Sequence, residues 1–196
     1  TSLYPTTIMA FNISPETFIT SEEECQKLGL NFDDVKSELE KDGVPIIDTG
    51  FQEDLFGKRY LFYSHKHKLG LMPFILKKLF LKRVEINSNL KAGNYEGDMA
   101  VAMKKRQWAF KLILNSAYGA MGFNYFRLCS YECADAITFF ARQALKYAII
   151  DFNGRGHKTL YGDTDSIFVK SEGKNEEQMN IELEGFNKNL ENNFVK

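Results

Sequence analysis

The feature that most constrains the fold is a pair of long helical patterns in the middle of the chain. Apolar residues recur at helical spacing behind Pro73, and this first pattern ends near Gly93, where glycine favours a helix end. A second pattern runs from about Tyr95 to Tyr118. Because only a short turn joins the two, the helices are expected to form an antiparallel hairpin.

Charge is distributed unevenly along the chain, although the net charge is only -1. Residues 16–54 hold 12 acidic and 3 basic residues, whereas residues 66–111, which include most of the hairpin, hold 11 basic and 3 acidic residues. The local balances are therefore -9 and +8. This asymmetry predicts that one segment faces an anionic partner.

Composition favours an intracellular globular protein. The 196 residues are 44 % hydrophobic, which is enough for one domain or for a main body with an insertion. Cys25, Cys129 and Cys133 form no C-x-x-C pair, so reduced thiols are expected. No apolar run reaches the roughly 18 residues that a membrane helix needs. A membrane partner is therefore not expected.

The flanking segments mix helical and extended patterns. The expected elements are a short helix behind Pro5, a turn at Ser14-Pro15, helices over 21–28 and 33–41, a β-hairpin within 44–64, a short extended piece over 123–128, a helix over 132–152, strands over 158–161 and 167–169, and a final helix from about residue 176. Trp108 and the phenylalanines at helical spacing are expected in the core. His65 and His67 stand among lysines, which favours a solvated or phosphate-facing role over a metal site.

Two aspartates, Asp163 and Asp165, stand one residue apart between strand-like runs in the sequence LYGDTDSIFV. Carboxylates this close repel each other unless a cation or a shared proton lies between them. Gly162 permits close approach of a backbone or a ligand. A metal-binding strand-turn-strand is one interpretation, and an ordinary Asp-rich turn is the other.

Two known aspartate motifs fit this stretch poorly. An EF-hand loop requires Asp or Asn and then Gly where this chain has Ile167 and Phe168. Haloacid-dehalogenase-like phosphatases also place Asp-x-Asp behind a strand, with the first Asp as nucleophile. That motif opens their fold, however, whereas only 31 residues follow Asp165 here.

A polar face is predicted on the second helix of the hairpin. Lys111, Asn115 and Tyr118 lie at helical spacing on one side, and Arg83 on the other helix adds a guanidinium that suits phosphate. A solvated stripe is the simpler alternative. Together with an acidic, metal-competent turn, such a basic hairpin provides what nucleotidyl transfer requires, namely neutralisation of a triphosphate and divalent ions.

Three segments resemble, in order and spacing, the signature motifs of family B DNA polymerases: SLYPTTIMAFNISPET at 2–17, KLILNSAYG at 111–119 and YGDTDS at 161–166. The first segment and residues 115–145 are most similar to the replicative polymerases of large tailed phages and related DNA viruses. The resemblance implies an α+β fold in which a palm with an antiparallel sheet and packed helices, residues 1–65 and 120–196, is interrupted by a fingers helical hairpin over 66–119.

The resemblance also implies roles for individual residues. Asp165 would be the main ligand of two catalytic Mg²⁺ ions, with Asp163 in support. The expected nucleotide contacts are the backbone amides of Ser2 and Leu3, Tyr4 under the deoxyribose, where it excludes a 2'-hydroxyl, Arg83 and Lys111 on the phosphates, and Asn115 in the same pocket. The expected DNA contacts are Tyr118 and Gly119, against the nascent base pair, and Thr164.

Two departures from the family pattern affect this reading. Asn87 stands where many relatives carry a lysine, four residues after the arginine, so triphosphate binding would depend more on Arg83 and Lys111, or Lys82 would substitute. The metal-binding aspartate of the first motif would lie two residues before Thr1, so the chain is expected to be a polymerase fragment that is inactive alone. The implied partners are primer-template DNA, dNTP and, through regions outside the chain, a sliding clamp or other replisome proteins, in the cytoplasm of an infected cell if viral. A non-catalytic nucleic-acid-binding remnant is the alternative.

Overall fold

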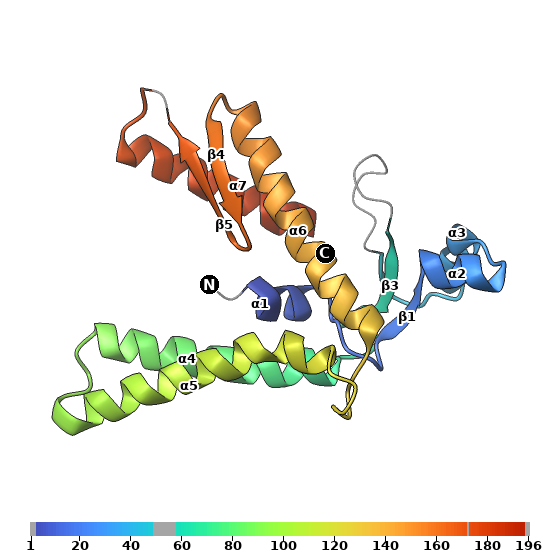
Figure 1. The fold of residues 1–196 in the computed structure, drawn as a ribbon, viewed down its shortest axis with the longest axis horizontal. Helices are drawn as coiled ribbons and strands as arrows, with labels where there is room; N and C mark the ends of the chain where they lie inside the picture. The colour runs from blue at the N-terminus through green and yellow to red at the C-terminus, as the bar shows by residue number, and fades with distance from the viewer. Residues whose placement is uncertain (1–2, 49–57, 172, 195–196) are drawn as a thin grey trace. The chain divides into compact units, whose positions relative to one another are not determined.

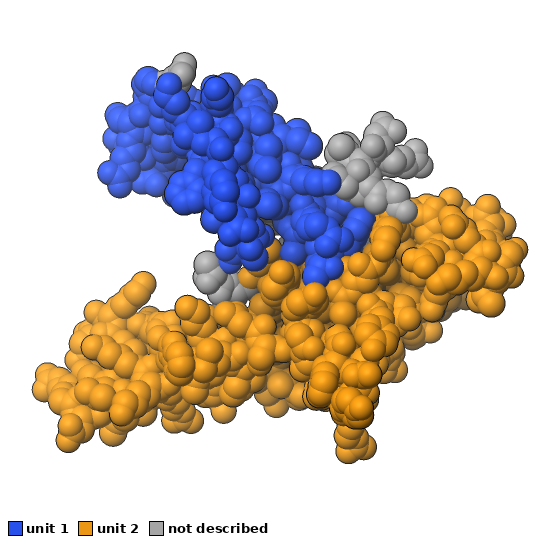
Figure 2. Space-filling view, in the orientation of Figure 1, with its two compact units in different colours: residues 1, 138–196 blue, residues 2–137 orange. Residues whose placement is uncertain are grey.

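The structure is a computed structural model that describes residues 3–48, 58–171 and 173–194. The chain divides into two compact units, one formed by residues 2–137 and the other by residue 1 and residues 138–196 (Figure 2). The described part contains helices and antiparallel strands (Figure 1), which confirms the predicted α+β class. No helix in these ranges is long and apolar enough to cross a membrane.

The first unit begins with short elements and ends in the long helices. Its elements are α1 (Leu3–Ala10), β1 (Phe18–Ser21), α2 (Glu22–Leu28), α3 (Phe32–Lys41), β2 (Ile46–Asp48), β3 (Tyr60–Tyr63), α4 (Leu71–Lys91) and α5 (Gly97–Met121). Helix α6 (Tyr131–Gly154) starts in this unit and runs into the second, which adds β4 (Lys158–Asp163), β5 (Ser166–Lys170) and α7 (Glu176–Phe194).

A small antiparallel sheet has the strand order β1-β3-β2. The predicted pairing within residues 44–64 is confirmed, since Ile46 lies opposite Tyr63, while its connection at 49–57 lies outside the described residues. Strand β1 was not predicted, and it adds to the other edge of β3 with Phe18 opposite Phe62. Cys25, Phe32 and Leu61 form a buried hydrophobic cluster between this sheet and helices α2 and α3.

Helices α4 and α5 pack side by side as the predicted hairpin, and α1 contacts both of them (Figure 1). The buried residues of α5, including Leu114 and Met121, lie in its last third. The prediction that Trp108 lies in the core is wrong, because its side chain is 58 % exposed. Residues 97–113 of α5 thus contain no fully buried side chain, although their apolar spacing resembles that of a core helix.

The predicted extended piece at 123–128 is also wrong. These residues form consecutive turns, in which the Phe126 N–H donates to the Phe123 carbonyl and the Cys129 N–H donates to the Phe126 carbonyl. Such local bonds satisfy the backbone without a partner strand.

A buried asparagine joins three parts of the first unit. Asn12, directly behind α1, adopts a positive φ of 54°, a conformation that asparagine tolerates better than most residues. Its Nδ2 donates to the carbonyls of Tyr63 and Lys68, both at 2.7 Å. Its Oδ1 accepts from the Gly70 N–H at 2.9 Å. One fully buried amide therefore ties the end of α1 to β3 and to the start of α4.

The N-terminus of α4 is capped by side chains that follow this asparagine. Gly70 at the N-cap position has no side chain to offer. Instead the Ser14 hydroxyl accepts from the Met72 N–H at 3.3 Å, and the Glu16 carboxylate accepts from the Leu71 N–H. A carboxylate is also favoured there by the helix dipole. The segment NISPET is therefore structural as well as part of a signature motif.

This position shifts the pKa of Glu16. Partial burial by itself would raise the pKa of the carboxyl group. The hydrogen bonds from the Leu71 N–H and the Ser14 hydroxyl, together with the charge of Lys68, outweigh burial and hold the pKa below its usual value of 4.5. The ionised form of Glu16 is therefore the one that stabilises this corner.

In the second unit, α7 packs against the last turns of α6 through an aromatic group. The ring of Phe186 lies 5.3 Å from that of Phe152 and 6.1 Å from that of Tyr147. The Asn153 side chain accepts two hydrogen bonds from Thr159, one from its N–H and one from its hydroxyl, both at 3.0 Å. Helix α6 thus supports both α7 and the start of β4.

A charged group secures the base of the β4–β5 hairpin. The carboxylate of Glu182 on α7 contacts two side chains, that of His157, which is buried, and that of Lys174. The Arg155 guanidinium donates to the Glu182 backbone carbonyl at 3.0 Å. Since His157 directly precedes β4 and Lys174 follows β5, these contacts hold the two ends of the hairpin near one residue of α7.

We expect the substitution Asn12→Asp to lower the free energy of unfolding by about 2–4 kcal/mol, because two buried carbonyls lose their donor and face a carboxylate instead. Chemical denaturation measures this change. Asn31→Asp is the matched control, since Asn31 caps α3 through its Oδ1 and aspartate caps equally well. Equal stability of the two variants would refute the role assigned to Asn12.

We expect the stabilisation by Glu16 to depend on pH. A carboxyl group whose pKa is lowered by folding contributes stability above its unfolded pKa, and this contribution is lost as the pH falls through the folded pKa. The melting temperature of the wild type should therefore exceed that of Glu16→Gln near neutral pH, and the gap should close below about pH 4.5. Glu40→Gln, at an exposed position of α3, is the control. A difference in melting temperature between the wild type and Glu16→Gln that stays constant with pH would contradict the role assigned to ionised Glu16.

Candidate active site

The two predicted metal ligands lie at the tip of the β4–β5 hairpin. Asp163 pairs with Ser166 across the hairpin, so that Thr164 and Asp165 form a two-residue loop. Both aspartates are exposed. The Thr164 hydroxyl donates to the Asp163 carboxylate at 3.1 Å. The structure therefore confirms the strand-turn-strand and presents both carboxylates at one small tip.

The backbone of this tip is strained. Thr164 has a φ of 48°, in the left-handed region that β-branched residues rarely adopt. A conformation of this kind costs on the order of 1–3 kcal/mol and is concentrated at functional sites. An ordinary Asp-rich turn would accommodate glycine or asparagine here without that cost, so the strain favours a functional tip.

The chemistry of the tip suits Mg²⁺, with one limit. Carboxylate oxygens are the ligands that this ion prefers, and it is held in proteins by one or two carboxylates together with waters and substrate phosphates. Within 3–48, 58–171 and 173–194 no group of three or more His, Cys, Asp or Glu side chains could enclose a metal. Asp163 and Asp165 therefore fit an ion whose remaining ligands come from water, substrate or another segment.

The first and second motifs meet in the first unit. The ring of Tyr4 on α1 lies 4.7 Å from that of Tyr118 near the end of α5, and both side chains are half-buried. Two residues predicted to contact the nucleotide and the nascent base pair are thus neighbours. Leu3 is the first residue of α1, and Ser2 lies outside the described residues.

Gly119 follows on the exposed side of α5. A Cβ atom built at Gly119 would meet no protein atom within 4 Å. Packing within the described chain therefore does not require glycine at this position. Open space of this kind is compatible with the close approach of a ligand.

The predicted phosphate-binding residues lie on both helices of the hairpin. Lys111 is half-buried and Asn115 is exposed on α5, and Arg83 is half-buried on α4. The Arg83 Nε–H donates to the Gln107 side-chain carbonyl at 3.1 Å. Gln107 was missed in the sequence, although it precedes Lys111 by one helical turn and so lies on the same face of α5.

These residues belong to two different compact units. Asp163, Thr164 and Asp165 are in the second unit, and the other described site residues are in the first. Within the units, the structure brings Tyr4 to Tyr118 and Arg83 to Gln107, and it places both aspartates on one hairpin.

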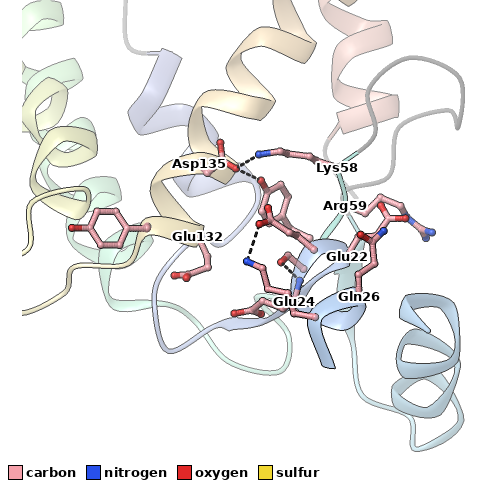
Figure 3. A pocket seen from close by; sticks show the side chains of 12 residues that line it. Glu22, Glu24, Gln26, Lys58, Arg59, Glu132 and Asp135 are labelled. Atoms are coloured by element: carbon pink, nitrogen blue, oxygen red, sulfur yellow. Dashed lines mark hydrogen bonds and ion pairs between the residues drawn. The ribbon is translucent and has the colours of Figure 1, made fainter. Parts of the chain in front are cut away.

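A cavity of about 460 Å³ in the first unit contains none of the predicted site residues (Figure 3). It is lined by Ser21, Glu22, Glu23, Glu24, Gln26, Lys27, Lys58, Arg59, Tyr60, Tyr131, Glu132 and Asp135. Its cations are already paired, for example Lys58 with Asp135 at 2.7 Å and Lys27 with Glu23 at 2.8 Å. The surplus of carboxylates disfavours a polyanion, so this cavity is not a triphosphate site.

One of the three cysteines is buried and unreactive. Cys25, Cys129 and Cys133 are free thiols, as predicted. Burial is the main cause that raises the pKa of Cys133 to about 12, so this thiol stays protonated at neutral pH. A protonated, buried thiol is chemically inert.

Comparison with known proteins decides the family. The model of the family described as DNA polymerase family B matches residues 1–195. The chain belongs to DNA polymerase family B. A DNA polymerase of Archaeoglobus fulgidus is 30 % identical over 178 residues, which cover 91 % of this chain and 19 % of that protein. DNA polymerase beta of African swine fever virus is 28 % identical over 183 residues, which cover 86 % of this chain and 14 % of that protein.

A solved structure supports the same family fold. The family B DNA polymerase of Pyrobaculum calidifontis superposes with a TM-score of 0.61 at 26 % identity, over 97 % of this chain and 21 % of that one. The chain thus spans about a fifth of the length of curated DNA polymerases that it matches. The relatives named above come from archaea and from a virus, so the similarity is not confined to viruses.

Proposed function

We propose that the protein to which this chain belongs is a DNA-directed DNA polymerase that extends a primer 3'-hydroxyl with dNTPs along a template during viral DNA replication. The observation that carries the proposal is the strained hairpin tip with Asp163 and Asp165 exposed, within a chain that the family B model matches over residues 1–195. Sliding clamps and other replisome proteins are proposed partners of its remaining regions.

In this proposal Asp165 and Asp163 hold divalent ions, with Asp165 as the principal ligand. Bound Mg²⁺ would activate the primer hydroxyl and stabilise the pyrophosphate leaving group. The described residues supply no third carboxylate to this tip. We therefore infer that the remaining ligands of the ion come from water, from the substrate or from another segment.

The first unit would bind the incoming nucleotide. Arg83 and Lys111 neutralise the triphosphate, and the backbone amides of Ser2 and Leu3 donate to its oxygens. The helical hairpin has a surplus of positive charge, which suits this polyanion. Asn115 lines the same pocket. Each of these groups lowers the cost of bringing a highly charged substrate to a primer.

Selection of the sugar and the base pair is assigned to neighbouring residues. Tyr4 would pack under the deoxyribose and leave no room for a 2'-hydroxyl, the group that distinguishes RNA from DNA precursors. The contact between Tyr4 and Tyr118 supports this role, because it restricts the movement of the Tyr4 ring. Tyr118, Gly119 and Thr164 are the proposed contacts to DNA.

We expect Asp165→Asn in the full-length protein to reduce primer extension by roughly a thousandfold or more, since an amide is a poor ligand for Mg²⁺ and several kcal/mol of charge stabilisation are lost. Binding of primer-template DNA, measured by fluorescence anisotropy, should change little because backbone contacts position the duplex. Asp163→Asn is the matched control with a smaller expected loss. Primer extension at the wild-type rate by Asp165→Asn would refute the assignment of Asp165 as a metal ligand. A wild-type protein that binds DNA but does not extend the primer would support the alternative, a non-catalytic nucleic-acid-binding remnant.

We expect Tyr4→Ala to admit ribonucleotides, because the side chain that excludes the 2'-hydroxyl is removed. The ratio of kcat/KM for dNTP to that for rNTP should fall by on the order of tenfold or more. Tyr125→Ala is the control, since Tyr125 is 85 % exposed and has no role in the proposed site. A ratio equal to that of the wild type would rule out the steric role of Tyr4.

A further inference from the structure

One polar contact joins the two helices of the hairpin. The Arg83 Nε–H on α4 donates to the Gln107 side-chain carbonyl on α5 at 3.1 Å. Both residues are half-buried, whereas their chain neighbours Lys82, Arg106 and Trp108 are exposed. The pair therefore lies on the sides of the two helices that face each other, where its geometry is held by the hairpin.

The contact engages a particular part of the guanidinium group. It uses Nε, which lies at the base of the fork, on the side-chain stem. A bond at this atom fixes the rotation of the guanidinium plane, while bidentate binding of phosphate requires that plane to be correctly oriented. Immobilising a side chain with many rotamers costs conformational entropy, so an arginine that is oriented in advance binds its ligand at a lower cost.

The chemical nature of the acceptor is also informative. An amide carbonyl orients the guanidinium without placing a negative charge beside it. A carboxylate at this position would orient the group equally well and would cancel the positive charge of the guanidinium. Glutamine is therefore suited to an arginine that must remain attractive to a polyanion.

The position of Gln107 on α5 connects it with the other proposed nucleotide contacts. Lys111 and Asn115 follow at one and two helical turns, on the same face of the helix. On α4, Asn87 occupies the position one turn after Arg83. A neutral Asn87 supplies no charge to the phosphates. Triphosphate binding therefore depends more on the orientation of Arg83 than it would with a lysine at position 87.

We propose that Gln107 is a positioning residue for the nucleotide triphosphate and acts by holding the Arg83 guanidinium in its binding orientation. This inference rests on the proposed function. It assigns Gln107 no contact with the nucleotide, so its effect must pass through Arg83. This requirement makes the proposal testable with a double-mutant cycle.

The experiment measures steady-state incorporation of dTTP opposite a template adenine by the full-length protein and its variants Gln107→Met, Arg83→Ala and the double variant. Methionine matches glutamine in length and helix propensity but offers no comparable acceptor. Gln107→Met is expected to raise the KM for dTTP roughly tenfold with kcat within about twofold and unchanged binding of primer-template. In the Arg83→Ala background, Gln107→Met should add no further change.

Controls separate the bond from general effects of the substitution. Gln26→Met, at an exposed position of α2, should leave KM unchanged. Gln107→Leu is a second variant without an acceptor and should behave as Gln107→Met does. Melting temperatures within a few degrees of the wild type show that both variants are folded.

The possible outcomes distinguish this inference from the proposed function. If Arg83→Ala raises KM and Gln107→Met does not, the positioning role is overturned and the nucleotide site stands. An equal effect of Gln107→Met with and without Arg83 also overturns it, since the effect would not pass through arginine. If Arg83→Ala leaves KM unchanged, the phosphate role of Arg83 in the proposed function fails, and the role of Gln107 fails with it.

Discussion

The hydrogen bonds of Asn12 are the interaction on which the first unit depends. A single amide satisfies two carbonyls and one N–H from three separate points of the chain, and it does so where water is excluded. Because buried polar groups are costly to leave unpaired, these bonds fix where α1 ends and where α4 begins. Ser14 and Glu16 then cap α4, so the base of the long hairpin is set by a segment more than fifty residues earlier.

This arrangement explains how structure and function share one motif. The segment from Ser2 to Thr17 carries proposed nucleotide contacts at its start and helix-capping groups at its end. The position of Tyr4 on α1 therefore depends on the same bonds that anchor α4. Its neighbour Tyr118 comes from α5, which packs on α4. Groups that would act together on a nucleotide are thereby held by one common framework.

The sequence predicted elements whose signal is local. The helical spacing behind Pro73 and Tyr95 gave α4 and α5 to within a few residues, and the alternation around Asp163 gave the hairpin tip. Features that depend on distant partners were missed. Strand β1 has only four residues and becomes a strand because β3 pairs with it. The segment 123–128 is rich in aromatic residues but finds no partner strand.

The same distinction applies to the site. The resemblance supplied Tyr4, Arg83 and Lys111, but no pattern in the sequence shows that the Tyr4 ring meets Tyr118, because that contact is a product of packing. Gln107 carried a weak local signal, its spacing from Lys111, which helical periodicity alone does not separate from a solvated stripe. Trp108 was misjudged because an apolar residue at helical spacing indicates a face of the helix and not what covers that face.

The length of α5 has a mechanical consequence. Its 25 residues make it about 37 Å long at about 1.5 Å per residue, and its buried side chains lie in the last third, near the base of the hairpin. Helix α5 is thus held by buried contacts near one end only. A rotation of about 10° within this buried third would displace the far end by about 4–6 Å, as follows from the rise per residue. Small changes in packing beside Leu114 and Met121 are thereby amplified along the basic helices.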